Sequence, residues 1–127
     1  MFTPYTRDTG KLQPWEYLPA SAGSYKIGQA LRVSDGVLLP VSGTGCPDYV
    51  CMYDGTTVQG QIIPVIRVTE RLVFETELSS DAADAKIGSK LQVSADSMGV
   101  DGAATGAFHV SYIEDTAAGS IVRGRFK

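Results

Sequence analysis

The chain has 127 residues, of which 43% are hydrophobic and 20% charged, a size and composition typical of one globular domain and not of a disordered segment. Its net charge of −3 gives no electrostatic reason to expect nucleic acid, whose binders carry a clustered basic excess. No apolar run approaches the ~20 residues that a membrane-spanning helix needs. We therefore expect neither nucleic acid nor a membrane as a partner.

The first 20 residues combine aromatic residues with three prolines, a mixture that favours an extended arm over a strand within a sheet. Clustered aromatic side chains usually mark an interface, because Trp and Tyr dominate interface energies. We therefore predict that residues 1–20 form an extended N-terminal arm and that residues 21–127 form a single β-barrel domain. The predicted partner-binding residues of the arm are Phe2, Tyr5, Trp15 and Tyr17. In the alternative interpretation, Trp15 and Tyr17 cover an open end of the barrel of their own chain.

Beyond the arm, apolar and polar residues alternate in several stretches, the pattern of half-buried strands. These stretches are residues 25–33, 71–78, 107–113 and 122–127. Asp-Gly pairs at 35–36, 54–55 and 101–102 separate such stretches and predict tight turns. Only residues 79–86 have a helical composition, and they are too few for more than about two turns. The sequence thus predicts an all-β fold, either a small β-barrel or a β-tulip-like sandwich.

A nine-residue segment occurs twice. KIGQALRVS at 26–34 and KIGSKLQVS at 86–94 share Lys, Ile, Gly, Leu, Val and Ser at a spacing of 60 positions. Extended without a gap, the match predicts an internal repeat of residues 26–67 and 86–127. The Gly of each unit predicts a bend before a strand, and Ile, Leu and Val of both units are predicted to be buried. Two such units could close one barrel with pseudo-twofold symmetry, although small barrels in general reuse such strand and Gly-turn patterns.

Motifs that carry catalytic chemistry are missing from the sequence. It has no nucleophile elbow, no phosphate-binding loop and no dinucleotide fingerprint. His109 is the only histidine, and strand alternation places it on the solvent side. We therefore expect no enzyme activity, no cofactor and no metal site.

The remaining reactive residues have structural interpretations. Cys46 and Cys51 are expected to be free thiols. Glu75 and Glu77 are expected to pair across strands with Arg123 or Arg125. A small barrel enzyme that uses two of the acidic residues remains an alternative.

Taken in chain order, several segments resemble the small capsid decoration, or head cement, proteins of tailed bacteriophages and prophages. The segments are QPWEYLPA, KIGQALRVSDGVL, IPVIRV, KIGSKLQVS, TGAFHV and GSIVRGRF. The resemblance implies a non-enzymatic β-barrel or β-tulip protein, often with an N-terminal arm, that forms a homo-oligomer, commonly a trimer.

The resemblance also implies a function. Such a structural virion protein binds the major capsid protein on the outer surface of the capsid and stabilises it. Without a visible secretory signal, synthesis is expected in the cytoplasm of a bacterial host. A carbohydrate-binding or receptor-binding β module of a phage tail or cell-surface protein is the alternative.

Overall fold

The computed structural model describes residues 1–7, 10, 13–102 and 105–127 and confirms the all-β prediction. No helix occurs in these residues, and hence none that is long and apolar enough to cross a membrane. The strands are β1 (Thr3–Arg7), β2 (Trp15–Ala20), β3 (Gly23–Tyr25), β4 (Ala30–Ser34), β5 (Val37–Pro40), β6 (Tyr49–Cys51), β7 (Gly55–Thr57), β8 (Gln61–Arg67), β9 (Leu72–Glu77), β10 (Lys90–Val93), β11 (Val100–Asp101), β12 (Phe108–Ile113) and β13 (Ile121–Phe126). Residues 79–86, the one segment of helical composition, form turns and bends.

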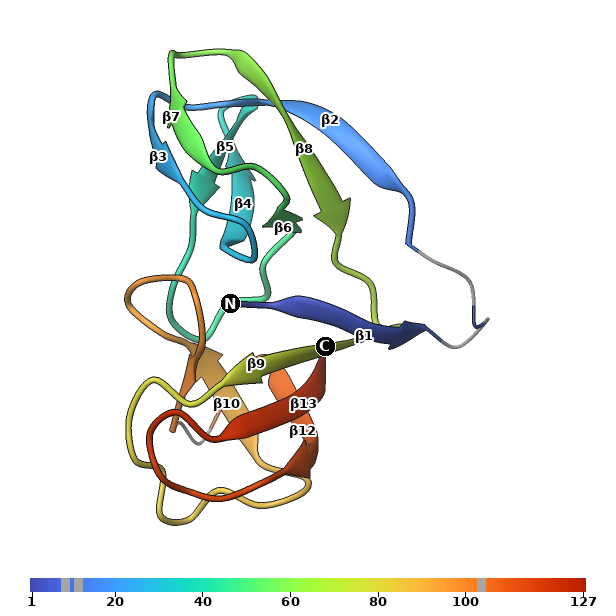
Figure 1. Ribbon diagram of the computed structural model, residues 1–127, viewed down its shortest axis with the longest axis vertical. Coiled ribbons are helices and arrows are strands. Elements are labelled where there is room, and N and C mark those ends of the chain that lie inside the picture. Colours follow the sequence, from blue (N-terminus) through green and yellow to red (C-terminus); the bar gives the residue numbers. More distant parts are fainter. Residues whose placement is uncertain (8–9, 11–12, 103–104) are drawn as a thin grey trace.

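The strands form two bodies that lie one above the other in Figure 1. We call them the first unit, β2 to β8, and the second unit, β9 to β13. In the first unit, strands β2-β5-β4-β6-β8 form a closed barrel, and β3 and β7 form a separate two-stranded ribbon. The barrel closes where β2 and β5 pair in parallel at Ala20 and Leu38. The predicted Asp35-Gly36 turn joins β4 to β5, and both residues have the positive φ that a tight hairpin requires.

The second unit repeats this arrangement. Its strands follow the order β9-β13-β12-β10-β11, and a parallel bridge between Leu78 and Val100 closes the ring back to β9. Strand β1 adds to the free edge of β9 as a sixth strand. The chain therefore folds into two rings of strands, in place of the single barrel expected over residues 21–127.

Hydrogen bonds match between the two units and support the predicted repeat. The N–H of Gly28 donates to Cys51 at 2.7 Å, and the N–H of Gly88 donates to Val110 at 2.9 Å. Three further bonds between backbone N–H and carbonyl groups match in the same way. The bond from Ser21 to Leu38 matches that from Ser79 to Val100, and the bond from Gly60 to Ala20 matches that from Gly119 to Leu78. The bond from Val68 to Asp48 matches that from Lys127 to Ala107. These bonds close the same turns and strand ends in both units, as expected of a duplicated fold.

The spacing of the repeat changes along the chain. Strands β4 and β10 match at a spacing of 60 residues. The cross-strand pair of Tyr49 with Arg67 in the first unit corresponds to that of Phe108 with Phe126 in the second, and both residues of this pair are shifted by 59. The ungapped alignment therefore failed after the first strand of the repeat. A one-residue shift moves side chains to the other face of a strand, so Ile62 is 57% exposed while Val122 is buried.

Burial within the repeated segment was predicted correctly for Leu31, Leu91 and Val93 but not for its other apolar residues. Ile27 and Ile87 are exposed because each lies in the turn before the strand, outside the alternating pattern. Val33 is also exposed, at the end of β4 beside the Asp35-Gly36 turn.

Residues 1–20 are not a separate arm, because their two strands pair within the two units. Strand β1 pairs with β9 and strand β2 with β8, while residues 8–9 and 11–12 lie outside the described part of the chain. The prolines that suggested an arm are compatible with both strands, since each strand has an edge where a missing N–H breaks no ladder.

A shared core joins the two units. Ala30, Val50 and Ile66 of the first unit pack in one cluster with the apolar side chains of the second unit. The N–H of Ala30 also donates to Ser97, at 2.8 Å. A second, smaller cluster fills the barrel of the first unit, around Leu31, Leu38, Ile63 and Val65. The position of one unit on the other is therefore fixed by packing as well as by the chain.

Candidate binding surface on the first unit

Three large apolar side chains are exposed together on the outer face of β2 and β8. Trp15 and Tyr17 alternate along β2, and they are 50% and 64% exposed. On β8, Pro64 is the cross-strand partner of Tyr17, and the next residue on the same face is Ile62, 57% exposed. We call Trp15, Tyr17 and Ile62 the β2–β8 surface. Its inner-face neighbours Ile63 and Val65 are fully buried, so a rigid strand pair holds the exposed rings.

The equivalent face of the second unit is closed by its own residues. Glu75 and Arg123 take the positions of Tyr17 and Pro64, and they form an ion pair of 2.8 Å. The Arg123 guanidinium lies between two aromatic rings, 4.0 Å from the Tyr5 centroid and 4.7 Å from the Tyr112 centroid. The pairing of Glu75 with Arg123 was predicted from the sequence. The second unit therefore satisfies its outer face internally, whereas the first leaves the same place apolar and open.

The two rings of strands also differ in the residues at one end, which are apolar in the second unit and mostly polar in the first. In the second unit, Phe74, Phe108 and Phe126 surround the side chain of Phe2, with ring centroids 5.4–6.4 Å from that of Phe2. Glu16, Tyr49 and Arg67 occupy the equivalent positions of the first unit. There Arg67 bonds both carboxylate oxygens of Glu16 at 2.9 Å and lies over the Tyr49 ring. The hydrogen bond from Arg67 holds the pKa of Glu16 below its usual range.

The structure separates the four aromatic residues predicted to bind a partner. Phe2 is 1% exposed and is a core residue, so its assignment as a partner-binding residue was wrong. Its side chain fills the end of the second ring because that ring is lined by three other phenylalanines. Tyr5 is half exposed but stacks on Arg123. Trp15 and Tyr17 lie together on the β2–β8 surface.

Ile62 belongs to the same surface, and the sequence analysis did not single it out. The ungapped alignment at a spacing of 60 matched Ile62 with Val122, which is buried. One feature of the sequence does indicate that Ile62 could be exposed. Ile62 and Pro64 lie on one face of the strand and Ile63 and Val65 on the other, and one of these two faces has to be on the outside of the barrel.

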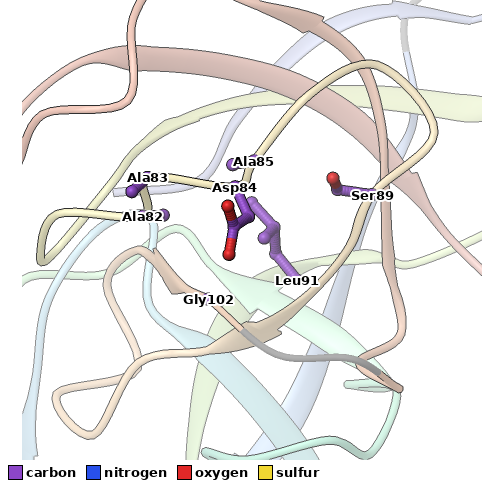
Figure 2. A pocket seen from close by; sticks show the side chains of 7 residues that line it. All are labelled: Ala82, Ala83, Asp84, Ala85, Ser89, Leu91 and Gly102. Carbon is purple, nitrogen blue, oxygen red and sulfur yellow. The ribbon is translucent and has the colours of Figure 1, made fainter.

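A pocket of about 370 Å³ lies in the second unit, between residues 82–85 and strand β10 (Figure 2). Its lining is Ala82, Ala83, Asp84, Ala85, Ser89, Leu91 and Gly102. Figure 2 shows the side chains of these seven residues, and Asp84 carries the only carboxylate among them. The other six lining residues include one hydroxyl, that of Ser89, and no histidine, lysine or cysteine. The lining therefore offers no basis for assigning a reaction to this pocket.

The other candidate groups are also dispersed. Within the described residues, no three His, Cys, Asp or Glu side chains are placed to hold a metal ion. His109 is partly exposed on β12, and its backbone pairs with Lys90 and Arg125. Both cysteines are free, Cys46 exposed and Cys51 buried, and burial raises the pKa of each thiol.

Comparisons with known proteins add no relative: no family model, no curated protein and no solved structure matches this chain.

Proposed function

We propose that this protein is a non-enzymatic structural virion protein that binds the outer surface of a phage capsid and stabilises it. The observation that supports binding is the β2–β8 surface, which is open and apolar where the equivalent face of the second unit is closed. The resemblance of the KIG-containing units and the terminal strand to head cement proteins supplies the partner, the major capsid protein. On this proposal the protein is made in the cytoplasm of the bacterial host and ends on the capsid.

The chemistry of the surface suits a protein partner. Trp and Tyr are enriched among residues whose truncation costs an interface about 2 kcal/mol or more. Here both rings project from a paired strand, so little conformational entropy is lost on docking. Binding that occurs only to assembled capsids stabilises the assembly by mass action. No catalytic step is required for this function.

Exposed Trp15 and Tyr17 also support one alternative, a carbohydrate-binding module in which the rings stack on sugars. The absence of charged residues among the three side chains of the β2–β8 surface fits either ligand. Neighbouring polar groups decide between them, because sugar sites add hydrogen bonds around the stacked ring. Tyr17 and Trp15 are flanked on β8 by Pro64 and Ile66, which offer no side-chain hydrogen bond. This favours a protein surface.

The test is co-sedimentation of the purified chain with empty capsids assembled from the major capsid protein encoded in the same genome. We expect saturable binding at a fixed ratio of chain to capsid subunit, and capsids that resist heat or osmotic shock better when decorated. A glycan array serves as the parallel experiment. A chain that stays in the supernatant at every concentration contradicts the proposal, and selective glycan binding would establish the alternative.

A further inference from the structure

Strand β2 has an open edge along its first residues. It pairs with β8 over its whole length, but with β5 only at Ala20. Figure 1 shows β2 at the outside of the first unit, with no strand beyond it. The equivalent edge of β9 is occupied, because β1 pairs antiparallel with it. Of two equivalent edges, one therefore has a strand partner and the other has none within the described residues.

The register shows which backbone groups of β2 point outward. Met52 donates its N–H to the carbonyl of Pro64 at 3.0 Å, so the backbone of Pro64 faces β6. The next residue, Val65, therefore faces β2, where its pairing partner is Glu16. Because hydrogen-bonding direction alternates along a strand, Glu16 bonds to β8 while Trp15 and Tyr17 point away from it.

These outward groups have no backbone partner among the residues that the structure describes. In the described part of the chain, no backbone hydrogen bond outside the strand pairs involves Trp15 or Tyr17. Their N–H and C=O groups line this edge of β2, which is the template that a further strand requires. Such an edge, next to exposed aromatic side chains, is a site for strand addition.

We propose that β2 pairs antiparallel with β2 of a second copy of this chain, about a twofold axis beside Glu16. In this register Trp15 of each copy faces Tyr17 of the other. The outward N–H and C=O groups of both residues then bond across the axis. The added strand runs antiparallel, as β1 does on β9. An isologous contact of this kind gives a closed dimer, not the trimer implied by the resemblance.

The side chains are compatible with the twofold register. On the outer face, each Trp15 lies opposite a Tyr17, an aromatic cross-strand pair of the kind that stabilises sheets. Beside the axis the two Glu16 carboxylates approach each other, and like charges directly opposite are unfavourable. Each carboxylate is already bonded by Arg67 of its own chain, which offsets part of the repulsion between the two carboxylates.

The dimer has a consequence for the β2–β8 surface. Two strands paired in one sheet present their outer faces on the same side, so the two surfaces join into one. This consequence rests on the proposed function, since it doubles the apolar area offered to a capsid and raises avidity. The dimer itself does not depend on any capsid.

Analytical ultracentrifugation of the full chain and two variants of Tyr17 tests the proposal. The wild type is expected to show a concentration-dependent equilibrium of monomer and dimer. Tyr17→Pro removes the outward N–H without removing a bond to β8, as Pro19 already does in this strand, and is expected to abolish the dimer. Tyr17→Ala keeps the N–H and is expected to retain a dimer that forms at higher concentration. A wild type that stays monomeric or forms a trimer, or a Tyr17→Pro variant that dimerises like the wild type, overturns the proposal.

Amide hydrogen exchange of the wild type gives a second readout that needs no variant, should Tyr17→Pro not fold. The N–H groups of Trp15 and Tyr17 are expected to exchange slowly at high protein concentration and faster on dilution. Those of Glu16 and Leu18, which bond to β8, are expected to stay unchanged. Equal exchange at all concentrations overturns the proposal. Protection of the Trp15 and Tyr17 amides from exchange that arises only when capsids are added also overturns the proposal. It would mean that a strand of the capsid protein pairs with this edge instead. Capsid binding by a strictly monomeric chain would therefore refute the dimer and leave the proposed function intact.

Discussion

Gly28 and Gly88 lie 60 residues apart and adopt nearly the same backbone conformation, with φ angles of +86° and +92°. Each lies in the turn that precedes the repeated strand of its unit and donates its N–H to the neighbouring strand, at 2.7 Å and 2.9 Å. Side chains with a Cβ disfavour this left-handed region by roughly 1–2 kcal/mol. The surroundings of the two glycines differ, because a Cβ on Gly28 would meet the side chain of Met1 whereas one on Gly88 would meet open space.

Replacing these glycines by alanine should therefore separate backbone strain from crowding. Gly88→Ala is expected to lower the free energy of unfolding by about 1–2 kcal/mol, the cost of the left-handed conformation alone. Gly28→Ala should lower it further, since Met1 has to move. Gly45→Ala is the control, because Gly45 has an ordinary φ and a Cβ added to it would have no neighbouring atom within 4 Å. Urea denaturation gives all three values, and equal losses at all three positions would contradict the assignment of equivalent turns.

The repeat also predicts equal roles for two leucines. Leu31 and Leu91 are 0% and 1% exposed in equivalent strands, one in each unit. Leu31→Ala and Leu91→Ala should each cost about 2–5 kcal/mol, the range for truncation of a buried Leu. Ile87→Ala serves as the control, because Ile87 is 69% exposed and its truncation should change stability little. A loss at Ile87 as large as that at Leu91 would contradict the exposed position of Ile87 in the turn before the strand.

Phe2 should behave as part of the core although it is the second residue of the chain. Phe2→Ala is expected to lower the free energy of unfolding by about 3–5 kcal/mol, because it opens a cavity among three other phenylalanine rings. Tyr17→Ala, at a position that is exposed in the monomer, should leave the melting temperature nearly unchanged at protein concentrations where the chain is monomeric. Thermal unfolding followed by circular dichroism compares the two. A Phe2→Ala protein as stable as the wild type would mean that the N-terminal strand does not insert into the second unit.

Asp96 should make stability depend on pH. Its carboxylate accepts hydrogen bonds from the Ser94 hydroxyl at 2.6 Å and the Met98 N–H at 3.0 Å, and these bonds lower its pKa. A pKa lower in the folded state than in the unfolded state adds stability above the ordinary carboxyl pKa, and that contribution is lost as the pH falls through the folded value. Asp96→Asn should therefore be less stable than the wild type at neutral pH, with a difference that shrinks towards acid pH. A constant difference from neutral to acid pH would rule out this contribution.

The all-β class, several of the strands and the repeat could be predicted because alternation and a nine-residue segment that occurs twice are local signals. Leu31 and Leu91 were placed correctly for this reason. The ungapped alignment was wrong in the second half of the repeat, because no local sequence pattern indicates a gap of one residue. Such a gap nevertheless exchanges the two faces of β8. Closure into two rings depends on long-range parallel contacts such as Ala20 with Leu38, which no short pattern encodes.

Aromatic composition drew attention to residues 2–17 but could not distinguish a core residue from a surface residue. Phe2 is buried because Phe74, Phe108 and Phe126 meet at one end of the second ring, and the equivalent end of the first ring has Glu16, Tyr49 and Arg67. That difference becomes visible only when the two units are compared in three dimensions. The same comparison identified the β2–β8 surface.

The most direct measurement is the affinity of matched tyrosine variants for capsids. Tyr17→Ser alters the β2–β8 surface, and Tyr112→Ser alters the equivalent side of the second unit, where an exposed ring of similar size stacks on Arg123. Quantitative co-sedimentation is expected to show that Tyr17→Ser weakens capsid binding by about 30-fold or more. This corresponds to at least about 2 kcal/mol, the cost of truncating a tyrosine at the centre of an interface. Tyr112→Ser should bind like the wild type. Equal binding by Tyr17→Ser and the wild type, or a loss confined to Tyr112→Ser, would contradict the assignment of this surface.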